Sequence, residues 1–181
     1  RGRPYRLYTS RMSSASGNQE RGLVVAVVGA TGLVGRTMVR ILEERNFPVA
    51  ELRPLAARGA GRSVRFRDTE IPVAEATPAA FEGVDVALFS AGAEVSLQLA
   101  TEAARRGCTV VDNSSAWRMD PTVPLVVSQV NPEALDGHRG IIANPNCSTM
   151  QLAPLLHALQ QAAGLKRVVV ATYQAVSGAG G

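Results

Sequence analysis

The sequence predicts an α/β protein whose core is a doubly wound parallel sheet. Over residues 23–143, short apolar runs of strand length alternate with segments of helical periodicity, a pattern typical of parallel strands joined by right-handed crossovers. Hydrophobic residues make up 46% of the 181 residues and aromatic residues only 4%, so the sheet must consist mainly of aliphatic side chains. A glycine-rich turn follows the first expected strand, where such sheets bind ligands.

Residues 1–22 are expected to form an unstructured leader. They carry five arginines against one glutamate, are rich in Ser and Gly and lack apolar periodicity. Arg-rich, acid-poor starts occur in organelle transit peptides, which would place the protein in a plastid. Because the leader shows little amphipathic pattern, we favour the alternative that Met12 is the natural start of a cytoplasmic protein.

The net charge of +4 lies entirely in this leader, since the rest of the chain carries fourteen basic and fourteen acidic groups. That neutrality, with no arginines interleaved among aromatic residues, argues against nucleic-acid binding. The longest apolar run, residues 23–30, is far too short to span a bilayer. Cys108 and Cys147 lack metal-ligand spacing, and with only His138 and His157 beside them no metal site is expected.

The first strand is expected over residues 23–28, as a continuous apolar run covered on both faces. A helix follows, ends at Asn46 and Pro48, and carries one apolar stripe formed by Val34, Met38, Ile41 and Leu42. The second strand is expected over residues 49–57. The later elements are a hairpin within 64–74, a strand at 84–89, a helix at 93–106 capped by Gly107, strands at 109–111, 125–127 and 141–143, a helix after Cys147 and a strand at 168–172.

The glycine-rich turn has the spacing G-x-x-G-x-x-G, a variant of the dinucleotide-binding fingerprint. Gly29 permits a tight turn, Gly32 lets backbone N–H groups approach a pyrophosphate, and Gly35 lets the helix pack closely on the strand. We therefore predict a Rossmann-type cofactor site, although a merely structural turn is the alternative. Its turn residues are Gly29, Thr31, Gly32, Leu33, Val34 and Gly35.

A second part of the cofactor site is expected at Ser90, Ala91 and Gly92. They follow the strand at 84–89, and ligands bind at the carboxyl ends of strands in such sheets. An ordinary strand–helix turn would look the same.

The end of the second strand favours NADP over NAD. An NAD site usually places a carboxylate there for the ribose 2′-OH, whereas an arginine suits the 2′-phosphate. Arg58 and Arg62 follow this strand, and Glu51 lies at its opposite end. Arg58 is therefore a candidate cofactor residue, the alternative being that both arginines are solvated surface groups.

Cys147 is the candidate nucleophile. Pro145 disfavours helix before it, and Asn146 and Ser148 are capping types, so the cysteine is expected at a helix N-terminus. This position favours the thiolate, the form that attacks a carbonyl carbon. The alternative is a small core residue, which is what we expect of Cys108.

Five motifs in this order resemble those of the aspartate-semialdehyde dehydrogenases, in particular the bacterial and plant branch with an N-P-N-C-S-T cysteine motif. They lie at residues 29–35, 89–92, 111–119, 144–149 and 172–180, and the resemblance covers residues 23–181. It implies NADPH-dependent reduction of β-aspartyl phosphate to aspartate β-semialdehyde and phosphate, on the route to Lys, Thr, Met and Ile. It also implies a homodimer or homotetramer.

The resemblance assigns roles to individual residues. Cys147 would attack the acyl phosphate to give a thioester, which hydride from NADPH would reduce. Arg118 would bind the substrate phosphate, Asn146 would line the site and Gln174 would position the acyl group. Ser177 and Gly178 would add to the cofactor site.

Two departures from the family pattern matter. Residues 56–61 lack the serines that usually help to hold the 2′-phosphate, which leaves dual use of NAD and NADP open. The family's catalytic histidine lies beyond position 181, and neither His138 nor His157 replaces it. We therefore expect a dinucleotide-binding domain at 23–143 and the start of a truncated α+β catalytic and dimerisation domain at 144–181, in a fragment that is itself inactive.

Two other functions stay open on the sequence. An N-acetyl-glutamyl-phosphate reductase would share the superfamily, but its cysteine motif should read more like G-C-Y-P-T. A non-catalytic dinucleotide-binding protein would keep the fold without needing Cys147, Arg118 and Gln174 together.

Overall fold

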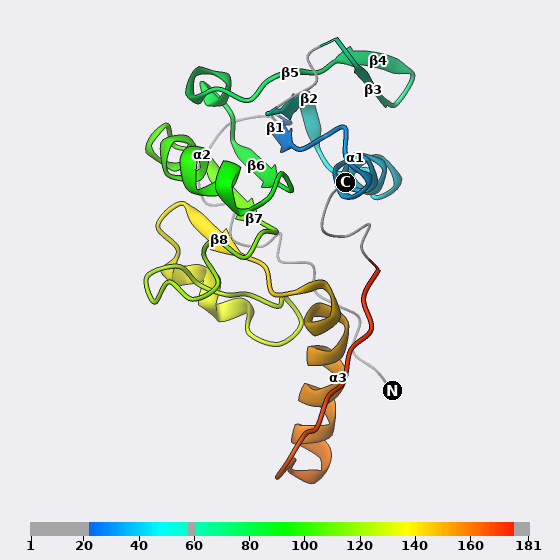
Figure 1. The fold of residues 1–181 in the computed structure, drawn as a ribbon, viewed down its shortest axis with the longest axis vertical. Helices are drawn as coiled ribbons and strands as arrows, with labels where there is room; N and C mark the ends of the chain where they lie inside the picture. Colours follow the sequence, from blue (N-terminus) through cyan, green and yellow to red (C-terminus); the bar gives the residue numbers. More distant parts are fainter. Residues whose placement is uncertain (1–21, 58–60, 176–181) are drawn as a thin grey trace.

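β1 (Leu23–Val28) lies inside a six-stranded sheet with the order β5-β2-β1-β6-β7-β8 (Figure 1). All five neighbouring pairs are parallel, which confirms the doubly wound class. The remaining strands are β2 (Val49–Ala56), β5 (Ala74–Glu75), β6 (Val86–Phe89), β7 (Thr109–Asp112) and β8 (Ile141–Ala143). The computed structural model describes residues 22–57 and 61–175; the expected leader up to residue 21, Arg58, Ser177 and Gly178 lie outside the described residues.

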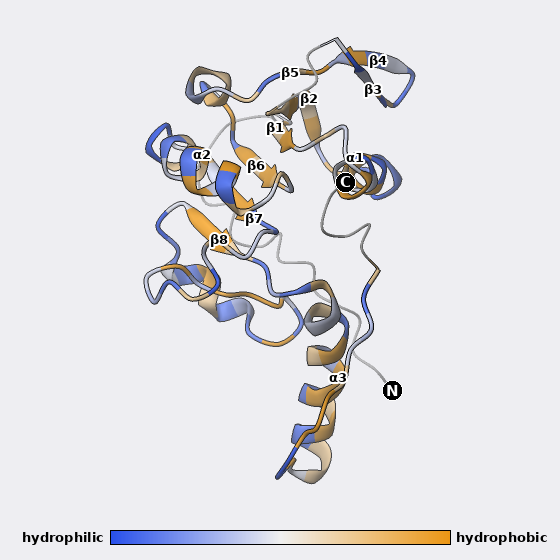
Figure 2. Ribbon diagram, viewed as in Figure 1, coloured by the Kyte–Doolittle hydropathy of each residue, from blue (hydrophilic) through white to orange (hydrophobic). Residues whose placement is uncertain are grey.

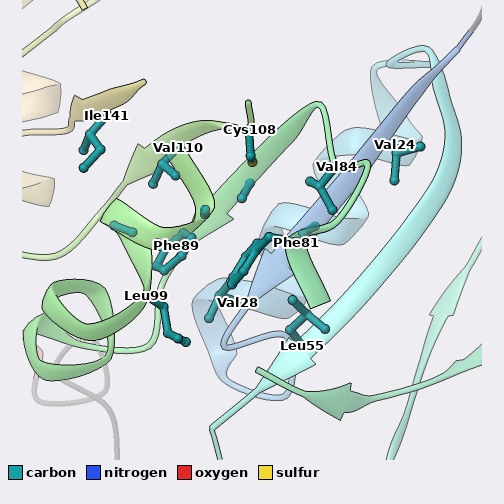
Figure 3. Close-up of a cluster of buried hydrophobic side chains, with 14 residues drawn as sticks. Val24, Val28, Leu55, Phe81, Val84, Phe89, Leu99, Cys108, Val110 and Ile141 are labelled. Atoms are coloured by element: carbon teal, nitrogen blue, oxygen red, sulfur yellow. The ribbon is translucent and has the colours of Figure 1, made fainter. Parts of the chain in front are cut away.

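Helices α1 (Leu33–Glu44) and α2 (Ala93–Arg105) cover opposite faces of the sheet. β1 alternates between the two faces because successive strand side chains point to opposite sides. Val25 and Val27 pack in one cluster with Val39 of α1. The other face packs with α2, and its members include Val24, Ala26, Val28, Leu99 and Ala103 (Figure 3).

Phe81 anchors this second cluster from a short 3-10 helix, η1 (Pro78–Phe81). Its side chain is fully buried and stacks on Phe89 with ring centroids 5.7 Å apart (Figure 3). η1 and η2 (Pro132–Gly137) are not predictable from the sequence pattern, since elements of four to six residues are too short to show a helical period. The expected hairpin is confirmed as β3 (Ser63–Phe66) paired with β4 (Thr69–Pro72).

Two expected strands are absent from the structure. Residues 125–127 form only an isolated bridge from Leu125 to Ala143, so the expected strand is reduced to one pairing. The strand expected at 168–172 is wrong, because a strand needs hydrogen-bonded neighbours and no described strand pairs with this segment. Its Val169 is 81% exposed.

α3 (Cys147–Ala163) projects away from the sheet, with the extended segment 165–175 beside it (Figure 1). None of its residues is buried, and hydrophobic residues are spread along its length (Figure 2). Leu155 is 65% exposed and Tyr173 is fully exposed. This part of the chain therefore presents a large apolar surface.

Candidate functional site

The glycine-rich turn after β1 is packed too closely to hold side chains at two of its glycines. Gly29 has a φ of +87°, and a Cβ on it would lie 2.4 Å from the carbonyl oxygen of Ser90. A Cβ on Gly35 would lie 2.1 Å from the carbonyl oxygen of Gly29. The first glycine thus allows the tight turn, and the third allows α1 to approach it, as the fingerprint predicts.

Among the described residues, no side chain caps the N-terminus of α1, which leaves its first N–H groups for a ligand. The helix is capped by Gly32, which has no side chain to bond them, and its first turn contains no acidic residue. The first N–H groups of a helix lack intrahelical partners and carry partial positive charge, so this end suits a phosphate. Leu33 is 62% exposed and Thr31 is half-buried, which leaves this end of the helix accessible.

Hydrogen bonds join the loops along the carboxyl edge of the sheet. The N–H of Gly29 donates to the oxygen of Leu55 at 2.8 Å, and the N–H of Ser90 donates to that of Val28 at 2.8 Å. Ser90, Ala91 and Gly92, which precede α2, therefore lie beside the glycine-rich turn. β1 and β6 are the neighbours at which the strand order changes direction, the usual place for a ligand in such sheets.

The same edge continues to the cysteine. The N–H of Asn113 donates to the oxygen of Phe89 at 3.0 Å, and the N–H of Asn144 donates to that of Asp112 at 2.8 Å. The segment that leads to Cys147 thus begins at the same edge as the glycine-rich turn.

Cys147 is the first residue of α3 and its side chain is exposed. Asn146 caps the helix, with its Oδ1 accepting from the N–H of Ser148 at 3.0 Å. The Cys147 Sγ lies 3.8 Å from the same Oδ1. The expected position at a helix N-terminus is confirmed.

Gln174 lies at the same helix end although it is 27 residues further along the chain. Its Nε2 donates to Asn146 Oδ1 at 3.3 Å and to Ser148 Oγ at 3.1 Å. Three of the four expected chemical residues, Cys147, Asn146 and Gln174, are therefore brought together.

Arg118, the fourth, is half-buried and joins two loops at the sheet edge. Its Nε donates to the oxygen of Asn144 at 2.8 Å, and one terminal nitrogen donates to that of Asn113 at 3.1 Å. Asn144 is three residues before Cys147, so Arg118 is attached to the approach to the cysteine.

Two features at this edge are not among the sequence-based predictions. Glu75 of β5 is in register with Ala56 at the end of β2, so a carboxylate lies on the strand beside the expected 2′-phosphate site. Only the pairing reveals this, because the two residues are nineteen positions apart. Asp112 and Ser96 are buried and hydrogen-bonded to each other; an acid at the end of an apolar strand followed by serines was an available signal.

Cys108 is buried, whereas Cys147 is exposed. Cys108 is 1% exposed, and burial, with a smaller contribution from the nearby Asp85 charge, raises the pKa of its thiol to about 12. It is a core residue, as expected.

Iodoacetamide is therefore expected to alkylate Cys147 at least about a hundredfold faster than Cys108. Peptide mass spectrometry after timed exposure of the folded chain measures both rates. In urea the two rates should converge, because burial no longer protects Cys108. Equal rates in the folded chain would contradict this placement of the two thiols.

No helix within the described ranges combines the length and apolar character needed to cross a membrane. In the same part of the chain, no three His, Cys, Asp or Glu side chains gather as potential metal ligands.

Comparisons with known proteins point in one direction. The family model described as "Semialdehyde dehydrogenase, NAD binding domain" matches residues 24–138. A curated relative named aspartate-semialdehyde dehydrogenase, from Aquifex aeolicus, is 55% identical over 163 residues, which cover 88% of this chain and 48% of the relative. The chain thus spans about half the length of the curated relatives it matches.

Solved structures agree with the sequence relatives. Aspartate semialdehyde dehydrogenase II from Vibrio cholerae is 46% identical, with a TM-score of 0.83 over 88% of this chain and 48% of that one. Aspartate semialdehyde dehydrogenase with NADP from Candida albicans is 27% identical, with a TM-score of 0.65 over 79% of this chain and 48% of that one.

Proposed function

Because the chain belongs to the semialdehyde dehydrogenase family, whose NAD-binding domain matches residues 24–138, we propose that the whole protein is an aspartate-semialdehyde dehydrogenase. The whole protein here means this chain together with any further residues of the same polypeptide. Its reaction is the NADPH-dependent conversion of β-aspartyl phosphate to aspartate β-semialdehyde and phosphate. The observation that carries the proposal is the shared sheet edge, from which both the glycine-rich turn and the Cys147 segment extend.

The turn fits the pyrophosphate of a dinucleotide. Bulk is excluded at Gly29 and Gly35, and the start of α1 presents uncapped N–H groups. Thr31, Gly32, Leu33 and Val34 complete the turn, with Ser90, Ala91, Gly92, Arg58, Ser177 and Gly178 as further cofactor residues. NADPH, when bound, supplies the hydride that reduces the substrate.

Cys147 is the group that attacks the substrate. Its sulfur forms a bond to the acyl carbon of β-aspartyl phosphate, the bond from that carbon to the phosphate oxygen breaks, and inorganic phosphate leaves. The product on the enzyme is a thioester. After reduction, the carbon–sulfur bond breaks, the aldehyde leaves and the thiolate is regenerated.

Arg118, Asn146 and Gln174 orient the substrate. The planar guanidinium of Arg118 is suited to the phosphate oxygens. The amides of Asn146 and Gln174 lie within hydrogen-bond distance of each other at the start of α3, where they can hold an acyl oxygen near the cysteine sulfur.

The neighbours of Cys147 include no general acid or base in the described ranges. The groups hydrogen-bonded around it belong to Asn146, Ser148, Thr172 and Gln174, and none of them titrates near neutral pH. His157 is ten residues further along α3, about 15 Å at the usual rise per residue. The isolated 181-residue chain is therefore expected to bind NADPH without turning over substrate.

The domain division is based on the burial of the elements. We place the dinucleotide-binding domain at residues 23–143 and the start of a catalytic domain at 144–181, since α3 leaves the sheet with no buried residue. A homodimer or homotetramer and a cytoplasmic location remain predictions.

The activity is tested in the reverse direction with the whole protein. Aspartate β-semialdehyde, inorganic phosphate and NADP should together produce NADPH, measured by its absorbance. Omitting phosphate is the control, because it is the acceptor of the acyl group. Activity with N-acetylglutamate semialdehyde alone would instead identify the reductase of that superfamily, and no activity with either aldehyde would favour a non-catalytic dinucleotide binder.

Glu75 is expected to limit the preference for NADPH over NADH. Its carboxylate lies on the strand beside the end of β2, where it would repel a 2′-phosphate. Glu75→Gln should tighten NADPH binding by about two- to fivefold, in the range of a partly screened charge interaction. NADH binding should change little.

Isothermal titration of both cofactors measures the two affinities. The matched control is Glu70→Gln, since Glu70 is an acidic residue on the β3–β4 hairpin instead of the six-stranded sheet. An unchanged NADPH affinity in Glu75→Gln would remove Glu75 from the cofactor site.

A further inference from the structure

Asp112, at the carboxyl end of β7, is a buried carboxylate without a part in the chemistry proposed above. Its side chain is 1% exposed, as is that of Ser96 on α2. Removing a carboxylate from water is costly unless hydrogen bonds replace the lost solvation. The hydrogen bonds to the Asp112 carboxylate must therefore offset the cost of its burial.

The carboxylate of Asp112 accepts three hydrogen bonds. Its Oδ1 accepts from the N–H of Ser114 at 2.7 Å, and its Oδ2 accepts from the Ser114 hydroxyl at 2.9 Å and from the Ser96 hydroxyl. Each of these hydroxyls is also an acceptor. Ser96 Oγ accepts from the indole N–H of Trp117 at 2.8 Å, and Ser114 Oγ accepts from the N–H of Ala116 at 3.1 Å.

The direction of these bonds is determined by their outer ends. The indole N–H of Trp117 and the backbone N–H of Ala116 can only donate. The single proton of each serine hydroxyl must then point to Asp112, which accepts on both oxygens. An asparagine at 112 has one oxygen and one NH₂ group. With its oxygen toward the N–H of Ser114, its NH₂ would face both hydroxyls, and their protons would lose their acceptor. In the opposite orientation its NH₂ would face the Ser114 N–H, which can only donate.

Asp112, Ser96, Ser114 and Trp117 form a hydrogen-bonded cluster. This cluster holds the loop that ends at Arg118. Asp112 bonds to Ser114 at the start of this loop and, through Ser96, to Trp117 at its end. Arg118 follows directly and uses two of its N–H groups on the carbonyl oxygens of Asn113 and Asn144. A guanidinium has five such groups. Three of them have no partner among the described residues and can bind an anion.

We propose that Asp112 is a positioning residue that holds Arg118 ready to bind the phosphoryl group of the substrate. The inference rests on the proposed function, because it takes Arg118 as the group that contacts phosphate. Asp112 itself touches neither substrate nor cofactor; it acts through Ser96, Ser114 and Trp117.

The test measures binding of inorganic phosphate to the whole protein by isothermal titration. Asp112→Asn is expected to weaken phosphate binding by about tenfold or more, because a displaced charged fork loses its paired hydrogen bonds. NADPH affinity should stay within about twofold, a readout that general unfolding would not spare. Arg118→Ala defines the complete loss of the anion site.

A second pair of variants keeps the test decisive if Asp112→Asn does not fold. Ser114→Ala removes a hydroxyl that links Asp112 to the loop and should weaken phosphate binding, whereas Ser114→Thr keeps the hydroxyl and should restore it. Ser128→Ala is the control, since the Ser128 hydroxyl is exposed and bonds only to Gln129 among the described residues. It should bind phosphate like the unsubstituted protein.

Trp117 reports on the loop without any activity. It is the single tryptophan of the 181-residue chain, so its emission in this chain should shift to longer wavelength in Asp112→Asn and Ser114→Ala and stay in place in Ser128→Ala. Unchanged phosphate affinity in Asp112→Asn, or in both Ser114 variants, would overturn the proposal.

The two hypotheses fail in different ways. If the unsubstituted protein catalyses the phosphate-dependent reaction but the cluster variants bind phosphate normally, the positioning role is wrong and the proposed function stands. If phosphate binding depends on the cluster but neither aldehyde is a substrate, the positioning of an anion-binding arginine stands and the proposed reaction is wrong.

Discussion

Replacing Cys147 by serine in the whole protein is expected to reduce turnover by roughly three orders of magnitude or more. The thiolate is both the nucleophile and the leaving group in the proposed reaction, and a serine hydroxyl at the same position has no base beside it among the described residues. The measurement is phosphate-dependent formation of NADPH from aspartate β-semialdehyde and NADP.

The fold and the cofactor site should be unaffected by this change. Cys147 is exposed at the first position of α3, so no core contact is lost, and NADPH affinity is expected to stay within about twofold. The matched control is Cys108→Ala, which removes the other thiol and should retain most of the turnover. Residual activity within tenfold of the unsubstituted protein in Cys147→Ser would show that the reaction does not proceed through a thioester on this residue.

Local patterns were sufficient to predict the parts of the site that depend on neighbouring residues. The glycine spacing predicts where α1 begins, because Gly29 and Gly35 lie where the backbone of the turn leaves no room for a side chain. Asn146 predicts the cap on α3 because capping uses the N–H groups of the next residues. Both parts are confirmed by the structure.

Contacts between distant segments could not be predicted in this way. The expected strand at 168–172 is wrong because an apolar β-branched run becomes a strand only beside a partner. Glu75 reaches the end of β2 through a two-residue strand that no periodicity can reveal. The link from Ser96 to Trp117 joins residues 21 positions apart, so the support of Arg118 was visible only in three dimensions.

The site combines residues with very different degrees of support. The cofactor turn and Asp112 lie on the buried sheet, where strands and hydrogen bonds on several sides hold them. Cys147 and Gln174 lie on segments with no buried residues. The glycine-rich turn is therefore held by the sheet, whereas Cys147 and Gln174 have no such support among the described residues.

Gly35→Ala is expected to destabilise the chain, although helix propensity predicts the opposite. In a helix interior, alanine is favoured over glycine by about 1 kcal/mol. Here a Cβ would lie 2.1 Å from the carbonyl oxygen of Gly29 and 2.8 Å from the Cα of Ala30, both backbone atoms. Moving them apart separates α1 from the turn, at an expected net cost of about 1–3 kcal/mol.

Urea unfolding followed by circular dichroism measures this free energy, and titration with NADPH measures the turn. NADPH binding should weaken about tenfold or more, because the N–H groups at the start of α1 move with the helix. Gly137→Ala is the matched control: a Cβ there meets nothing within 4 Å, so its stability should change by less than about 0.5 kcal/mol.

The sign of the Gly35→Ala effect decides between two roles for this glycine. If packing against Gly29 determines the residue at 35, the variant loses stability and cofactor affinity together, and failure to fold while Gly137→Ala folds is the extreme of the same result. If the variant gains stability and keeps its NADPH affinity, the close approach of α1 to the turn is not required. The third glycine of the fingerprint would then have no structural role in this chain.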